Sequence, residues 1–77
     1  MTQKEWKDIF GDNLVSLLKE NGMTQLELAK ESGVSSSAIS DYINKRSMPS
    51  LVAAINMAYV LNVSVEDFVD FEEPVDY

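Results

Sequence analysis

A set of polar side chains between positions 36 and 44 has the chemistry needed to read the bases of a nucleic acid. The set consists of Ser36, Ser37, Ser40, Asp41 and Asn44. Serine hydroxyls bond to any base or to phosphate, a carboxylate accepts from the amino group of cytosine, and an asparagine amide pairs with adenine. We treat all five as candidate base-reading residues, although only Asn44 is of a strongly discriminating type. The simpler alternatives are helix capping for the serines and a surface charge for Asp41.

Two cations, Lys45 and Arg46, follow this set directly. They are candidates for contacts with phosphate, and an ordinary solvated loop is the simpler alternative. Phosphate contacts position a protein on a duplex without specifying its sequence. The two cations would therefore anchor the polar set that precedes them.

No arrangement of residues in the sequence supports catalysis. The chain has neither histidine nor cysteine, which removes the commonest general base, the commonest metal ligand and all thiolate chemistry. The serines at 35–37 have no histidine to activate them, and the acidic residues lack the spacing of a calcium loop. We therefore expect a protein that is not an enzyme, with no cofactor, no metal and no small-molecule effector.

Capping patterns divide the 77 residues into five predicted helices. They are expected at about 3–21, 25–32, 36–43 and 51–61, with a short fifth helix after Ser64. Capping boxes begin at Thr2, Thr24 and Ser64, each with an acidic residue three positions later. Gly11 is a weak point in the first helix.

Two features of the pattern concern the core. The helix at 51–61 is apolar on most faces, which predicts burial. Ile39 and Leu61 are expected in the core, where the third and fourth helices meet the rest of the bundle.

The helices at 25–32 and 36–43 are joined by Gly33-Val34-Ser35, and such a pair can place its second helix in a major groove. The TQxELAxxxGVS core of the lambda-repressor-like, Cro-type helix-turn-helix family (XRE-family transcriptional regulators) resembles the segment TQLELAKESGVS at 24–35. The family's IS-x-[YI] and PSL motifs are similar to ISDY at 39–42 and PSL at 49–51. The resemblance covers roughly residues 10–69.

This resemblance implies an all-α, compact five-helix lambda-repressor-like domain. It also implies a sequence-specific, phage- or plasmid-type DNA-binding regulator that is repressor-like and binds a double-stranded DNA operator as a homodimer. The glutamine that opens the family's second helix matches Gln25, which would donate to a phosphate, and Thr24 and Ser35 are further phosphate candidates. An exposed polar residue in a first helical turn is the simpler alternative for Gln25.

The chain departs from the family just after the predicted recognition helix. The family's usual Glu-x-Gly is replaced there by Ile43-Asn44-Lys45. Without the glycine, Asn44 or Lys45 must adopt the left-handed conformation of the turn.

The net charge of −7 has the wrong sign for a protein that approaches phosphates. Residues 65–77 contain six acidic residues and no basic one, whereas residues 1–64 have a net charge of −1. We therefore expect a DNA-binding domain at 1–69 and an acidic, irregular tail at 70–77.

The C-terminal segment also contains apolar residues that are candidates for a dimer interface. They are Phe68, Phe71, Val75 and Tyr77. They would either cover the core of their own protomer or meet the same segment of a second protomer. A frayed terminus without a role is the simpler alternative.

The acidic charge supports an alternative function as well. A protein-interaction module, antirepressor- or antitoxin-like, would keep the fold and bind a protein in place of DNA. The N-terminus is too polar for a signal peptide, and no apolar run approaches the roughly 20 residues that span a bilayer. We expect a cytoplasmic protein that does not associate with membranes.

Overall fold

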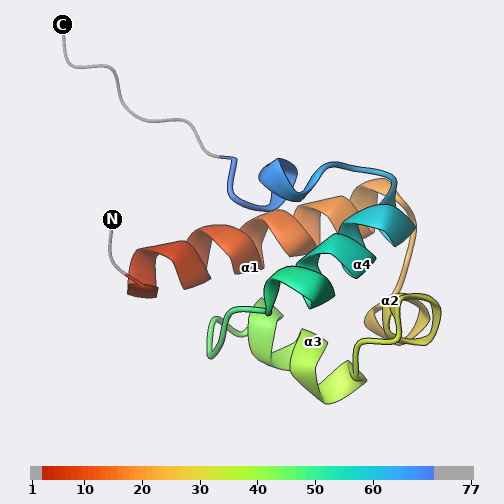
Figure 1. Ribbon diagram of the computed structural model, residues 1–77, viewed down its shortest axis with the longest axis horizontal. Helices are drawn as coiled ribbons and strands as arrows, with labels where there is room; N and C mark the ends of the chain where they lie inside the picture. Colours follow the sequence, from red (N-terminus) through yellow and green to blue (C-terminus); the bar gives the residue numbers. More distant parts are fainter. Residues whose placement is uncertain (1–2, 71–77) are drawn as a thin grey trace, which may run out of the picture.

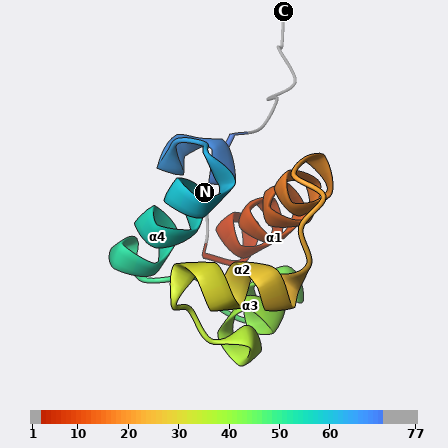
Figure 2. The same ribbon diagram turned by 90° about the vertical axis from the view of Figure 1, so that its right-hand side faces the viewer.

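The computed structural model describes residues 3–70, with side chains from Glu5 onward. This part of the chain forms four α-helices and one 3-10 turn and contains no strand. The elements are α1 (Gln3–Glu20), α2 (Gln25–Ser32), α3 (Ser36–Ile43), α4 (Leu51–Leu61) and η1 (Val65–Phe68). α1 is the longest helix in Figure 1. In the view of Figure 2, α1 and α4 lie on opposite sides, α2 and α3 lie together below them, and η1 lies above.

Local capping fixes where the helices begin, as the sequence predicted. The hydroxyl oxygens of Thr24, Ser35 and Ser50 each accept a hydrogen bond of 3.1 Å from the backbone N–H three residues later. Each bond satisfies a donor that the helix itself cannot satisfy. At the other ends, Gly33 terminates α2 with φ 75° and Asn62 terminates α4 with φ 59°. Thr2, the expected cap of α1, lies outside the described residues.

The prediction of a fifth helix was wrong in kind, because η1 is a single 3-10 turn. The expected capping residue is present, and the backbone N–H of Ser64 donates to the Asp67 carboxylate at 3.1 Å. However, the N–H groups of Asp67 and Val69 donate to carbonyls only three residues back, both at 3.0 Å. Four residues are too few to nucleate an α-helix, and the 3-10 form is the one that short segments adopt.

The core lies where all five elements converge. Its buried side chains are Phe10, Leu14, Leu17, Leu18, Leu28, Ile39, Tyr42, Ala54, Met57, Ala58, Leu61 and Phe68. The Phe10 ring is central: it meets the Tyr42 ring edge-to-face with centroids 5.8 Å apart, and the Phe68 ring with centroids 4.9 Å apart. The predicted burial of Ile39 and Leu61 is confirmed, since their exposed fractions are 0% and 1%.

The predicted burial of α4 on most faces was wrong. Ala54, Met57, Ala58 and Leu61 face the core, but the opposite side of the helix is exposed. The reason is geometric: α4 packs against α2 and η1, and no other part of the described chain covers its outer side. Apolar composition therefore indicated a helix that avoids water, but not what would cover it.

The described helices do not have the properties of membrane-spanning segments. Between residues 3 and 70, none combines the length and the apolar character that crossing a bilayer requires.

Candidate nucleic-acid interface

The turn between α2 and α3 is rigidly built. The N–H of Gly33 donates to the carbonyl of Ala29 at 3.0 Å, and the Ser32 hydroxyl donates to the carbonyl of Leu28 at 2.6 Å. The Ser32 oxygen in turn accepts from the N–H of Val34 at 3.2 Å. These bonds fix the angle at which α3 leaves α2. α3 lies at the lower edge of the molecule in Figure 2, with its inner face held by buried Ile39 and Tyr42.

Ser36 and Ser37 are the predicted base-reading residues that are free to make contacts. Both lie in the first turn of α3 and are exposed. In the part of the chain that the structure describes, neither hydroxyl has a hydrogen-bond partner. A hydroxyl at such a position can donate to or accept from a base edge or a phosphate.

The other three predicted base-reading residues already have partners within the protein. The Asn44 amide donates to the carbonyl of Ser40 at 2.8 Å and to the Ser40 hydroxyl at 3.3 Å. Asp41 accepts from Arg46. Asn44 is exposed, whereas Ser40 and Asp41 are half-buried. To reach a base, Asn44 must give up its bonds to its own helix.

Lys45 is held by a carboxylate from the first helix. Its Nζ lies 2.9 Å from Oδ1 of Asp12 on α1. The hydrogen bond and the charge of Asp12 raise the pKa of Lys45, so the ammonium is fully charged at neutral pH. Lys45 also takes the left-handed conformation, with φ 64°, while Asn44 has φ −86°. The sequence left this choice between the two residues open.

Arg46 is paired with a carboxylate of α3. Its Nε donates to Oδ1 of Asp41 at 3.0 Å, and its backbone N–H donates to the Asp41 carbonyl at 2.8 Å. The pair is solvent-accessible, with exposed side-chain fractions of 62% for Arg46 and 45% for Asp41. The remaining guanidinium N–H groups are still available to a phosphate.

The three predicted phosphate contacts at helix starts are all exposed: Thr24, Gln25 and Ser35. Thr24 and Ser35 act as the caps of α2 and α3, as their places in the sequence predicted. Thr24 completes a capping box, because its backbone N–H and its hydroxyl each donate to Oε1 of Glu27 at 3.0 Å. These two bonds lower the pKa of Glu27. The first N–H groups of α2 have no partner within the helix and point toward its N-terminal side.

Of the predicted dimer residues, one is described. Phe68 has an exposed fraction of 1% and packs against Phe10 within its own protomer. It therefore offers no surface to a partner. Phe71, Val75 and Tyr77 lie outside the described residues.

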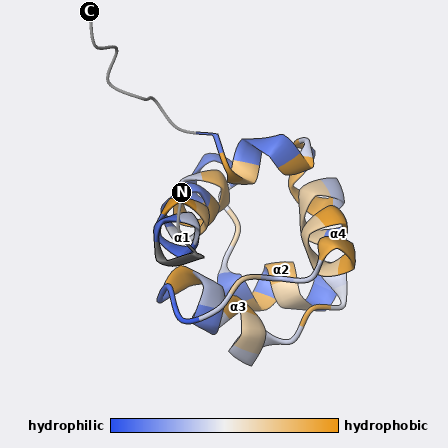
Figure 3. Cartoon of the chain, turned by 60° about the vertical axis from the view of Figure 1, so that its left-hand side comes forward, coloured by the Kyte–Doolittle hydropathy of each residue, from blue (hydrophilic) through white to orange (hydrophobic). Residues whose placement is uncertain are grey.

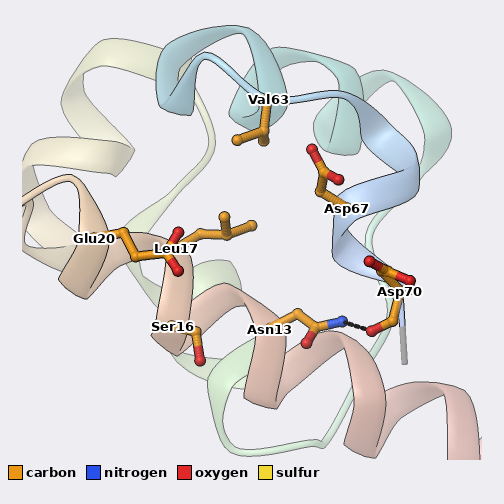
Figure 4. A pocket seen from close by; sticks show the side chains of 7 residues that line it. All are labelled: Asn13, Ser16, Leu17, Glu20, Val63, Asp67 and Asp70. Carbon is orange, nitrogen blue, oxygen red and sulfur yellow. Dashed lines mark hydrogen bonds between the residues drawn. The ribbon is translucent and has the colours of Figure 1, made fainter. Parts of the chain in front are cut away.

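A hollow between α1 and η1 is lined by three acidic residues. Figure 4 shows Glu20, Asp67 and Asp70 around it, together with Asn13 and Ser16. The Asn13 amide donates to the carbonyls of Phe68 at 2.9 Å and Asp70 at 2.8 Å, which ties the segment after η1 to α1. Three carboxylates repel phosphate electrostatically, so we do not assign this hollow to the nucleic-acid interface.

The sequence reasoning missed Asp12. No local pattern connects it to Lys45, because the two residues meet only when α1 packs against the end of α3. It also did not pair Asp41 with Arg46, although their separation across a helix end was compatible with a contact.

Comparison with known families agrees with this geometry. A family model described as "Helix-turn-helix" matches residues 14–68, which is more than half of the chain. A search of curated proteins and a search of solved structures each returned no match. The matched family consists of DNA-binding regulatory domains and not of enzymes. With its helix-turn-helix at α2 and α3, the chain belongs to the family of XRE/lambda-repressor-like helix-turn-helix regulators.

Proposed function

We propose that this chain is a sequence-specific transcriptional regulator, repressor-like, that binds a double-stranded DNA operator with α3 in the major groove. One observation carries the proposal: the inner face of α3 is locked into the core by Ile39 and Tyr42, while Ser36 and Ser37 stand free on its exposed first turn. A rigid helix with unpartnered polar groups at its N-terminal end is suited to direct base reading.

Phosphate contacts would hold this helix in register. Gln25 at the start of α2 and Arg46 after α3 are both exposed, and the N-terminal backbone of α2 adds N–H donors. Lys45 would contribute the second cation. Because so few cations are available, the affinity of one protomer would be modest.

A homodimer would compensate for the small number of cations in one protomer. Two protomers on a pseudo-palindromic operator would double the contacts, with the two recognition helices about one helical turn of DNA apart. Residues 1–69 would form the DNA-binding unit, with residues 70–77 as an acidic extension. The expected cytoplasmic location stays a prediction.

Selection from random duplexes tests the proposal directly. The full chain is incubated with a randomised DNA library, and bound duplexes are amplified and sequenced over several rounds. We expect an enriched motif with two-fold symmetry. The matched control is a Ser36→Ala/Ser37→Ala double variant, whose substitutions lie at exposed positions and should leave folding intact. A library that shows no enrichment with the unmodified chain would contradict DNA reading.

A protein-interaction module is the second candidate, and a specific observation favours it. Both cations beside α3 are paired with carboxylates of the same chain, Lys45 with Asp12 and Arg46 with Asp41. These pairs reduce the positive potential that would attract a duplex. A protein partner has no such requirement.

Asp12→Asn separates the two functions. The substitution frees Lys45 from its ion pair and removes a negative charge near α3, so binding to any duplex should strengthen. Binding of a protein partner should not improve. Glu31→Gln is the matched control, because it makes the same charge change at an exposed position of α2. Equal affinities for DNA in the two variants would count against Lys45 as a phosphate contact.

A further inference from the structure

The outer side of α4 forms an apolar stripe, which we define as Leu51, Val52, Ile55 and Tyr59. Their exposed fractions are 69%, 67%, 47% and 86%. Residues four apart lie on one face of a helix, so these side chains form a continuous surface. Figure 3 shows α4 coloured largely toward the hydrophobic end of the scale. A contiguous patch of this kind marks a contact surface.

The stripe is also free of charge. α4 has the sequence LVAAINMAYVL and is the only helix of the described chain without a charged residue. Two copies of a chain with a net charge of −7 repel each other wherever their carboxylates meet. On α4, two copies can approach without placing charged groups directly opposite one another.

Three residues of the stripe are placed symmetrically about Ile55. Leu51 lies four residues before it and Tyr59 four residues after it. In a two-fold contact, each residue meets a counterpart and the counterpart meets it in return. We propose that the stripe binds a second copy of this chain, in a two-fold contact of antiparallel α4 helices centred on Ile55. Leu51 of each copy then packs against Tyr59 of the partner subunit.

The available area sets the strength of this contact. Four side chains of this size and exposure present on the order of 500 Å², close to the roughly 600 Å² per partner at the low end of specific interfaces. An apolar groove continues the stripe beyond Leu51, between the start of α4 and η1, and is lined also by Met48, Pro49, Val65 and Val69. A contact of this size belongs with the small interfaces of transient complexes.

The inference deepens the proposed function and rests on it for the role of the dimer. α4 begins at Leu51, and only residues 44–50 separate it from the end of α3. A two-fold axis on α4 therefore carries the two copies of α3 as a fixed pair, as an operator with two half-sites requires.

Cysteine cross-linking locates the axis. The sequence has no cysteine, so Ile55→Cys in the full chain places one thiol per protomer at the centre of the proposed contact. A disulfide forms readily only where two Cα atoms come within about 7 Å. We expect Ile55→Cys to cross-link at least about tenfold faster under mild oxidation than Lys19→Cys, an exposed control on α1. Equal rates would overturn the proposed axis.

Sedimentation of variants with single substitutions measures the strength of the dimer contact. Ile55→Glu should weaken dimerisation at least about tenfold, while Lys19→Gln, which changes the net charge equally from a position outside the stripe, should not. Tyr59→Ser tests the same contact without adding charge and is expected to weaken it as well. Circular dichroism and urea midpoints establish that each variant is folded. Dimers that persist unchanged in both stripe variants would assign assembly to another surface, such as residues 70–77.

Both experiments are carried out without DNA, so failure of the α4 dimer can be distinguished from failure of the proposed function. A chain that cross-links through position 55 but selects no duplex keeps this inference and loses the regulator. A chain that selects a motif while Ile55→Cys behaves like Lys19→Cys keeps the regulator and loses the α4 dimer.

Discussion

Gly11 of α1 lies directly against the backbone of Tyr42 at the end of α3. A Cβ added to Gly11 would stand 2.8 Å from the carbonyl oxygen of Tyr42 and 3.2 Å from that of Ile43. Glycine in the middle of a helix costs stability, which made this residue a weak point in the sequence. The structure gives the reason for the glycine: only a residue without a side chain lets α1 approach the end of α3 so closely.

Gly11→Ala should therefore destabilise the domain, although alanine is the better helix former. The gain in helix propensity is about 1 kcal/mol, whereas overpacking against a backbone that cannot rotate away costs about 1–3 kcal/mol. The urea midpoint should fall. Ser16→Ala, at an exposed position of the same helix, should not lower it. A higher midpoint for Gly11→Ala would mean that α1 and α3 can separate without cost.

Truncation of core side chains should remove much of the free energy of unfolding. Leu61→Ala and Ile39→Ala each remove a side chain with an exposed fraction of at most 1%, and each should cost about 2–5 kcal/mol. Leu26→Ala is the matched control, because Leu26 is 70% exposed and its truncation should change stability by less than about 0.5 kcal/mol. Chemical denaturation measures all three. Unchanged midpoints for the core variants would contradict the packing of α3 and α4.

Local chemistry explains how much of this structure the sequence could predict. Caps such as Thr24, Ser35 and Ser50 act on N–H groups three residues away, so the helix starts were accessible from short patterns. The 3-10 form of η1 was not, because its cap pattern is the same as that of an α-helix. The exposed side of α4 was missed for a different reason: periodicity identifies an apolar face but not the element that covers it.

The candidate site followed the same division. The exposure of Ser37 follows from the helical period, which turns it away from Ile39, whereas Ser36 is exposed as the first residue of α3. The pairing of Lys45 with Asp12 depends on the packing of α1 against the end of α3 and has no local signal. The hydrogen bond from the Asn44 amide to the Ser40 carbonyl competes with bonds to solvent and to any ligand, and the sequence alone does not show which of these bonds forms.

The capping box of α2 should make stability depend on pH. Hydrogen bonds from Thr24 lower the pKa of Glu27 from its ordinary value of 4.5. A lowered carboxyl pKa stabilises the folded state above the unfolded-state pKa, and this contribution disappears as the pH falls through the folded-state value. Glu27→Gln should thus be less stable than the unmodified chain at pH 7, with the difference closing below pH 4.5.

Thermal unfolding across this pH range checks the prediction. Glu31→Gln, which removes a carboxylate from the same helix but not from the capping box, should not lower the stability at pH 7. A constant difference between Glu27→Gln and the unmodified chain down to pH 3 would mean that the charge of Glu27 does not support the cap.

Base reading and phosphate binding should separate by mutation. Ser37→Ala and Asn44→Ala should change the preference at particular base pairs, by about 1–3 kcal/mol where a bidentate contact is lost. Arg46→Ala should weaken binding to every duplex alike and reduce the salt dependence of log K by about 0.9. Titrations of selected and mismatched duplexes at several salt concentrations measure both effects. A uniform loss from Ser37→Ala and Asn44→Ala would contradict their assignment.

Position 45 allows stability and DNA binding to be moved in opposite directions. Lys45 adopts a left-handed conformation that costs a residue with a side chain roughly 1–2 kcal/mol, and its solvent-exposed ion pair with Asp12 offsets little of this cost. Lys45→Gly and Lys45→Ala both delete the cation and the ion pair, so both should lose the same DNA affinity and reduce the salt slope by about 0.9. Only glycine relieves the backbone, and Lys45→Gly should unfold at a higher urea concentration than Lys45→Ala. Equal midpoints would contradict the left-handed turn, whereas unchanged DNA affinity in both variants would remove Lys45 from the interface and leave Arg46 as the cation beside α3.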